Sequence, residues 1–163
     1  MVKRALIAIV DAAHARLYTY TQEGDAEPQF TELRDLVNPG RQAHGMFTDK
    51  PPRSPGDNHG TKDDHRGDHI AELDARFSKD VISQVEALVR EYELPQVILV
   101  AGPKSLGVLR GEAARLEKRG IRVDEIAQNL AWLSAPQIHD QLAALNVIGP
   151  RMRAAVGRSA RTR

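Results

Sequence analysis

Two short apolar runs constrain the fold of this chain more than any other feature. Residues 4–10 read RALIAIV, and residues 96–101 read QVILVA. Neither run alternates between apolar and polar side chains, as a strand with one solvated face would. Both runs therefore predict strands that are buried on two faces, and such strands need helices on each side of their sheet.

The rest of the chain supplies the remaining elements of an α/β fold. Apolar and β-branched residues predict three more strands, over residues 14–21, 29–37 and 121–127. Apolar residues at helical spacing predict three helices, over residues 68–94, 103–120 and 134–145, with Asp68 and Ser134 as N-caps and Gly120 as a C-cap. The order is βββ–loop–αβαβα, which predicts a three-layer, mixed sheet of the ribonuclease H-like type.

The chain of 163 residues suits one domain, which we expect over residues 1–145. The remaining residues, 146–163, contain five arginines and no acidic residue, so they carry +5 while residues 1–145 carry −4. We expect this basic tail to be disordered. It either makes the chain more soluble or binds phosphate backbones.

A long polar loop is predicted over residues 38–69. Nine of its 32 residues are Gly or Pro, and it holds four of the six histidines of the chain. Loops of this length inside compact domains are usually functional or disordered. Because the rest of the chain reads as an ordinary scaffold, we expect the function to lie on or beside this loop.

The loop histidines give one hypothesis for chemistry. His59, His65 and His69, together with Asp68, offer the imidazole and carboxylate ligands that transition metals take. Asp11 follows the first strand, where a metal-dependent hydrolase would place a carboxylate. No HExxH motif accompanies the histidines. A metal-dependent hydrolase is therefore an alternative rather than the leading interpretation.

Several other functional classes lack their sequence signals. The chain has no cysteine, no GxSxG and no Walker A motif, and no apolar run long enough to span a membrane. We therefore expect a cytoplasmic protein without a cofactor.

The segment after residue 101 still places Lys104 and Arg110 where they can face an anionic partner. Trp132, the single tryptophan, is assigned by default to core or edge packing.

Four stretches resemble the bacterial family of host attachment proteins. They are Asp11-Ala-Ala-His-Ala-Arg-Leu-Tyr18, Leu36-Val-Asn-Pro39, Asp49-Lys-Pro-Pro-Arg-Ser54 and Leu99-Val-Ala-Gly-Pro-Lys-Ser-Leu-Gly107-Val-Leu-Arg110. The family is also similar in topology to the central domain of archaeal-type peptide release factors. In those proteins the loop before the long helix carries Gly-Gly-Gln, which is absent from this loop. The resemblance therefore does not imply peptidyl-tRNA hydrolysis.

These observations predict that the chain is a non-enzymatic interaction protein, which binds a partner through the 38–69 loop. The alternative to it, besides the hydrolase, is a ribosome- or RNA-binding module related to release-factor domains, so the partner is an unknown protein or a ribosome or RNA. The candidate binding residues are Asp11, Arg16, Arg41, Arg53, Arg66, Lys104 and Arg110.

Overall fold

A computed structural model of the protein describes residues 2–43 and 63–152. Its strands are β1 (Arg4–Val10), β2 (His14–Thr21), β3 (Gln29–Val37), β4 (Gln96–Ala101) and β5 (Arg122–Ala127). Its helices are α1 (Pro39–Ala43), α2 (Asp63–Glu91), α3 (Pro103–Lys118) and α4 (Ala135–Ala144). None of these helices combines the length and the apolar character that crossing a lipid bilayer requires.

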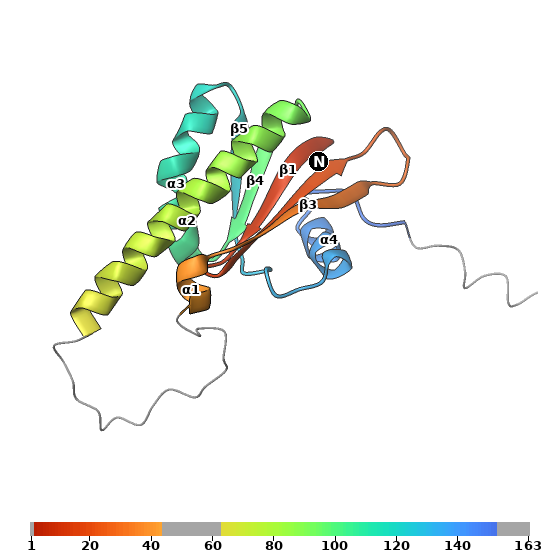
Figure 1. Ribbon diagram of the computed structural model, residues 1–163. Coiled ribbons are helices and arrows are strands. Elements are labelled where there is room, and N and C mark those ends of the chain that lie inside the picture. The colour runs from red at the N-terminus through yellow and green to blue at the C-terminus, as the bar shows by residue number, and fades with distance from the viewer. Residues whose placement is uncertain (1, 44–62, 153–163) are drawn as a thin grey trace, which may run out of the picture.

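The strands form one five-stranded sheet in the order β3-β2-β1-β4-β5 (Figure 1). β1, β2 and β3 pair antiparallel as a meander, with Ala8 opposite Leu17 in the first pair. β4 returns parallel to β1, with Leu99 beside Ala8, and β5 lies parallel to β4. This mixed sheet is the ribonuclease H-like arrangement, and it confirms the predicted fold class.

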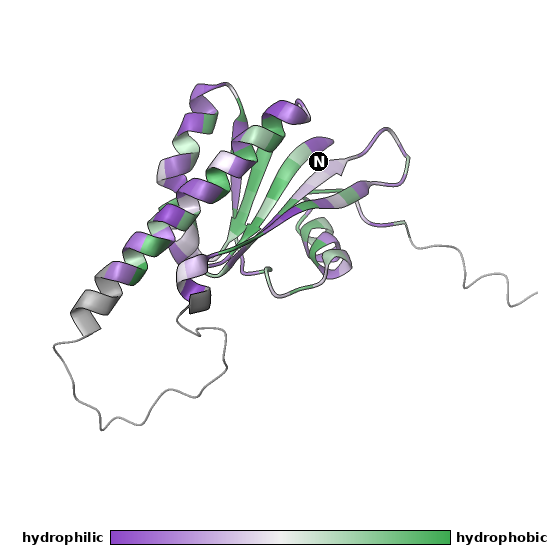
Figure 2. Ribbon diagram, in the orientation of Figure 1, coloured by the Kyte–Doolittle hydropathy of each residue, from purple (hydrophilic) through white to green (hydrophobic). Residues whose placement is uncertain are grey.

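Helices cover the sheet on both faces, as the two apolar runs require. α2 and α3 pack on one face and α4 packs on the other (Figures 1 and 2). Alternate residues of β1 serve the two cores: Leu6 and Ala8 point toward α2 and α3, and Ile7 and Ile9 point toward α4. All four have no exposed surface. Burial on both faces is therefore the physical reason that β1 shows no polar alternation.

The helix ends in the second half of the chain follow their sequence signals. Ser134 and Gln137 form the reciprocal capping box at the start of α4. Gly120 follows the last residues of α3 with a φ of 81°, a conformation that glycine adopts without a Cβ penalty.

The start of the long helix corrects the predicted loop. α2 begins at Asp63 rather than after Asp68, so Asp68 lies within the helix and is not its N-cap. In addition, α1 occupies the beginning of the predicted loop. The first turns of α2 read DDHRGDH and lack apolar periodicity, which is why the pattern did not reveal them. Two acidic residues at this end are favourable for the helix dipole.

The packed region also continues beyond residue 145. Ile148 is fully buried in the core beneath α4, and the Gly149 amide donates a hydrogen bond to Tyr20 Oη at 2.8 Å. His139 Nε2 lies 2.8 Å from the Gly149 carbonyl oxygen. Arg151 forms an ion pair with Asp140. The first residues of the predicted basic tail therefore belong to the domain.

Candidate binding cleft

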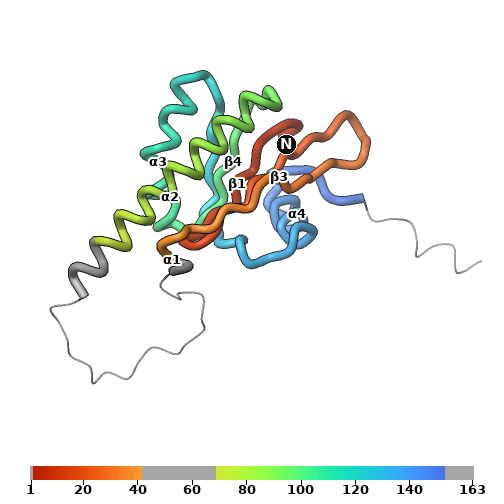
Figure 3. The backbone as a smooth tube through the Cα atoms, viewed as in Figure 1, coloured from red at the N-terminus to blue at the C-terminus, as the bar shows by residue number. Residues whose placement is uncertain are grey.

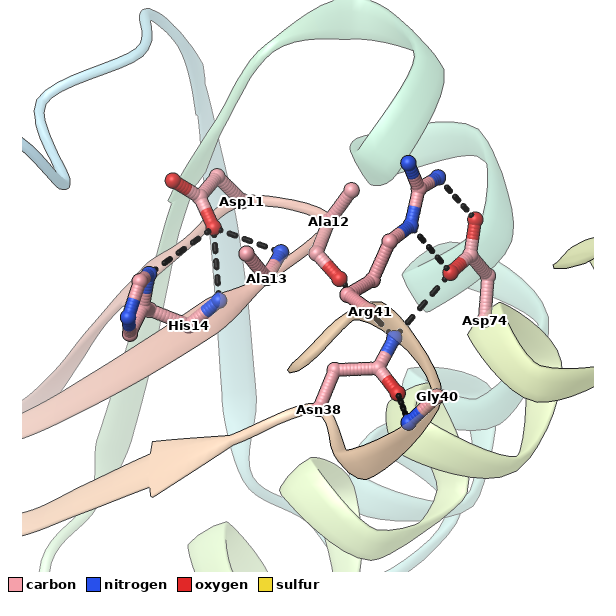
Figure 4. A network of polar contacts seen from close by, with 8 residues as sticks. All are labelled: Asp11, Ala12, Ala13, His14, Asn38, Gly40, Arg41 and Asp74. Carbon is pink, nitrogen blue, oxygen red and sulfur yellow. Dashed lines mark hydrogen bonds and ion pairs between the residues drawn. The ribbon is translucent and has the colours of Figure 1, made fainter. Parts of the chain in front are cut away.

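The turn between β1 and β2 is organised by Asp11. Its Oδ1 accepts hydrogen bonds from the backbone amides of Ala13, at 2.8 Å, and His14, at 2.6 Å (Figure 4). This side-chain-to-backbone pattern is the reason that aspartate suits a tight turn. The turn lies beside α1, at the end of the sheet where β1 passes into β2 (Figure 3).

Asn38 ties this turn to two helices. Its side chain is almost completely buried, at 1% exposure. Asn38 Nδ2 donates to the Ala12 carbonyl at 2.9 Å and to Asp74 Oδ1 at 3.1 Å, while its Oδ1 accepts from the Gly40 amide at 3.2 Å (Figure 4). One amide group therefore fixes the β1–β2 turn, α1 and α2 relative to one another.

Arg41 and Asp74 form the second connection between α1 and α2. Arg41 Nε donates to Asp74 Oδ1 at 3.1 Å, and Arg41 Nη2 donates to Oδ2 at 2.7 Å. This two-point geometry is the strong form of the arginine–carboxylate pair. The hydrogen bond to Asp74 raises the pKa of Arg41 above its ordinary value, so the guanidinium stays charged.

The start of α3 reaches the same place because of the sheet topology. β1 and β4 are parallel neighbours, so their carboxyl ends meet at one edge of the sheet. Gly102 caps α3 without a side-chain hydrogen bond, and Pro103 follows at the first position. Lys104 is exposed, and within the described part of the chain it forms no ion pair.

These elements surround a hollow of about 400 Å³, which we name the β1–β4 cleft. Its lining residues come from the β1–β2 turn, α1, the start of α3 and the segment after β5. They are Asp11, Ala12, Ala13, Arg41, Gly102, Pro103, Lys104, Ser105 and Asn129. A smaller hollow of about 50 Å³ extends toward Asp74 and Phe77 on α2, and it shares Asp11, Ala12, Arg41, Lys104 and Ser105 with the first.

The structure brings three of the predicted binding residues together, since Asp11, Arg41 and Lys104 all line the β1–β4 cleft. Two others are engaged elsewhere. Arg16 pairs with Glu32 on β3, and its Nη1 donates to the carbonyl oxygens of Ala131 and Leu133. Arg110 pairs with Glu125 on β5 at 2.7 Å. Both of these arginines therefore stabilise contacts between elements.

The other predicted residues lie in or beside the 38–69 segment. Arg53 and His59 fall outside the described residues, and His65, Arg66 and Asp68 are described only as backbone of α2. His69 is exposed on the same helix. Among residues 2–43 and 63–152 with described side chains, no group of three His, Asp or Glu residues is placed to hold a metal ion.

Three residues of this region were not among the predicted site residues. Asn38 lies in the Leu36–Pro39 stretch, which carries the family resemblance. That resemblance could have indicated Asn38 as a candidate residue. Asp74 is one of several polar residues on a helix, and no pattern separates it from Glu72, which is exposed and pairs with Arg76. Trp132 is 77% exposed, which corrects its assignment to core or edge packing.

The fold and the cleft define a class: a ribonuclease H-like α/β protein with a polar hollow where its two central parallel strands end. The model of a family described as "Protein required for attachment to host cells" matches residues 6–142. The chain belongs to that family.

The solved structures that are similar to the chain include the following two. One is the RuvC structure from Thermus thermophilus, with 13% identity and a TM-score of 0.41, covering 92% of this chain and 84% of that one. The other is the Ppx/GppA phosphatase of Aquifex aeolicus, with 10% identity and a TM-score of 0.35. That match covers 77% of this chain, which spans 36% of the length of the phosphatase chain. No curated protein sequence matches this chain.

Proposed function

We propose that the protein is a non-enzymatic binding protein that holds an anionic group of its partner in the β1–β4 cleft. The observation that supports this function is the position of Lys104. Lys104 lies in the first turn of α3 and lines, together with Arg41, a hollow of about 400 Å³, which is large enough for a small anionic group.

The family description speaks of attachment to host cells, a role that a protein performs by binding. The arrangement of carboxylates also favours binding over hydrolysis. One oxygen of Asp11 accepts two amide hydrogen bonds, and both oxygens of Asp74 accept from Arg41. Two-metal hydrolysis needs several carboxylates that share metal ions. The carboxylates of Asp11 and Asp74 instead accept hydrogen bonds from backbone amides and from Arg41.

The position of α1 supports a role for the predicted loop in binding. Arg41 lies on α1, and residues 44–62 follow directly after this helix in the chain. We propose that the partner contacts this segment, including Arg53, after its anionic group has entered the cleft. The expected partner remains an unknown protein or a ribosome or RNA.

A charge reversal at Lys104 tests this function. Lys104→Glu places a carboxylate at the cleft, whereas Lys118→Glu makes the same change in the exposed last turn of α3 and serves as the matched control. Each tagged chain is used to capture partners, with and without nuclease treatment. We expect wild type and Lys118→Glu to retain the same partner and Lys104→Glu to lose it. Equal capture by all three proteins would contradict the proposal.

A further inference from the structure

Trp132 is exposed to solvent, and hydrogen bonds and core contacts fix the segment that carries it. The segment joins β5 to α4, and the indole ring is the most exposed of the large apolar side chains in the described part of the chain, at 77%. Trp132 Nε1 donates to the carbonyl oxygen of Asn129 at 3.1 Å. The ring is therefore tethered to the backbone while most of the residue's surface remains exposed.

Arg16 and two leucines hold the residues on each side of the tryptophan. Arg16 donates to the carbonyl oxygens of Ala131 and Leu133, which flank Trp132 in the chain. Leu130 is buried and Leu133 packs against the core under α4. Because these contacts order the segment in advance, a ligand that stacks on the indole loses less entropy on binding. Arg16 is thus a positioning residue for this surface.

Asn129 connects Trp132 to the β1–β4 cleft. Asn129, whose carbonyl accepts the indole N–H, also lines the cleft together with Lys104 and Ser105. Asn129 therefore links the exposed aromatic residue, through its hydrogen bond to the indole, to the cleft that the exposed Lys104 also lines. A ligand that fits both needs an aromatic ring joined to an anionic group.

We propose that the ligand is a nucleotide, whose base stacks on Trp132 while its phosphate binds beside Lys104. The inference rests on the proposed function, because it identifies the anionic group that the cleft takes. Base–aromatic stacking tolerates any base, so this site selects nucleotides as a class. Asp11 also lines the cleft, and a carboxylate there can accept from a ribose hydroxyl or from an amino group of a base.

The single tryptophan of the chain makes the test direct, because all indole fluorescence comes from Trp132. The full chain is titrated with a single-stranded uridine oligonucleotide of about twelve residues and, separately, with uridine monophosphate. We expect saturable quenching. Quenching by the oligonucleotide alone identifies a nucleic acid as the source of the nucleotide, and quenching by both probes identifies free nucleotides as ligands too.

Variants then separate stacking from charge, with binding followed by the anisotropy of a labelled oligonucleotide. Trp132→Leu should weaken binding about 5- to 150-fold, and Trp132→Phe should restore part of the affinity. Lys104→Ala should lower the slope of log affinity against log salt by about 0.7, the share of one phosphate contact. Lys118→Ala should leave the slope unchanged.

The outcomes that overturn the inference are also distinct. Absence of saturable quenching by both probes would overturn it, as would equal affinities for wild type and Trp132→Leu. If Lys104→Glu still abolished capture of a partner in that case, the partner would be a protein with an anionic group. The proposed function would then stand, and the nucleotide would be excluded as its ligand.

Discussion

Asn38 Nδ2 donates a hydrogen bond to Asp74 Oδ1 at 3.1 Å, and the two residues stand 36 positions apart in the chain. The same Asp74 oxygen accepts from Arg41 Nε. Asp74 thereby joins the buried amide that fixes the β1–β2 turn to the arginine that lines the cleft. This three-residue network ties Arg41, which lines the cleft, to the β1–β2 turn and to α2.

Asn38→Ala should destabilise the fold. The change removes the partners of the Ala12 carbonyl and the Gly40 amide, at a site where Asn38 is 1% exposed. We expect a loss of about 2–3 kcal/mol in the free energy of unfolding, measured by urea denaturation. Lys79→Ala, at an exposed position on the same helix as Asp74, is the control and should change the value by less than about 0.5 kcal/mol. A loss no larger than the control's would show that the network is not structural.

The Arg41–Asp74 pair should show a measurable coupling energy. Both side chains are about one-fifth exposed, at 21% and 20%, and two hydrogen bonds join them. A double-mutant cycle with Arg41→Gln and Asp74→Asn should give about 1–2 kcal/mol, above the range of exposed pairs. Arg41→Lys should lose much of this energy, because an ammonium group cannot form the two-point contact. A coupling energy near zero would contradict this reading of the pair.

Two glycine-to-alanine changes should have opposite effects. A Cβ on Gly40 would lie 2.5 Å from Leu73 Cδ1, so Gly40→Ala must move the Leu73 side chain or α1 and should cost about 1–3 kcal/mol. A Cβ on Gly111, within α3, would meet no atom within 4 Å. Gly111→Ala should stabilise the fold by about 0.5–1 kcal/mol. The same sign for both changes in thermal denaturation would contradict the close contact at Gly40.

Tyr18 should cause the free energy of unfolding to fall at alkaline pH. Burial raises its pKa to about 12 from an ordinary value of 10, although Arg16 opposes the shift. Because the folded-state pKa is the higher one, the stabilising effect is complete below pH 10 and is lost as the pH rises toward 12. Absorbance of tyrosinate should show one group titrating near pH 12, absent in Tyr18→Phe. Identical alkaline titration of the two proteins above pH 11 would refute the assignment.

The fold was predictable because burial leaves a direct pattern in sequence. The runs at β1 and β4 are apolar on both faces, and the capping box at Ser134 is a local signal. The location of Asp11 and Lys104 at one hollow was predictable for a related reason. Each follows the end of a strand or begins the helix after one, and parallel neighbours bring such positions together.

Other parts of the site depend on contacts between distant segments. Asp74 is a polar residue on a mostly polar helical face, and only the packing of α1 on α2 distinguishes it from Glu72. Trp132 was assigned to packing because tryptophan is usually buried in part. Its exposure follows from the path of the β5–α4 segment, which Arg16 fixes from another strand. Single-sequence patterns do not contain this information.

The central claim, that the β1–β4 cleft takes an anionic group, can be tested by mapping amide chemical shifts in the isotopically labelled full chain. Inorganic phosphate is the probe, with chloride at equal ionic strength as the reference. The account predicts saturable shifts concentrated at Ala13, Lys104 and Ser105, and their loss in Lys104→Glu. Absence of saturable shifts, or shifts centred on α4 or the β2–β3 hairpin, would contradict it.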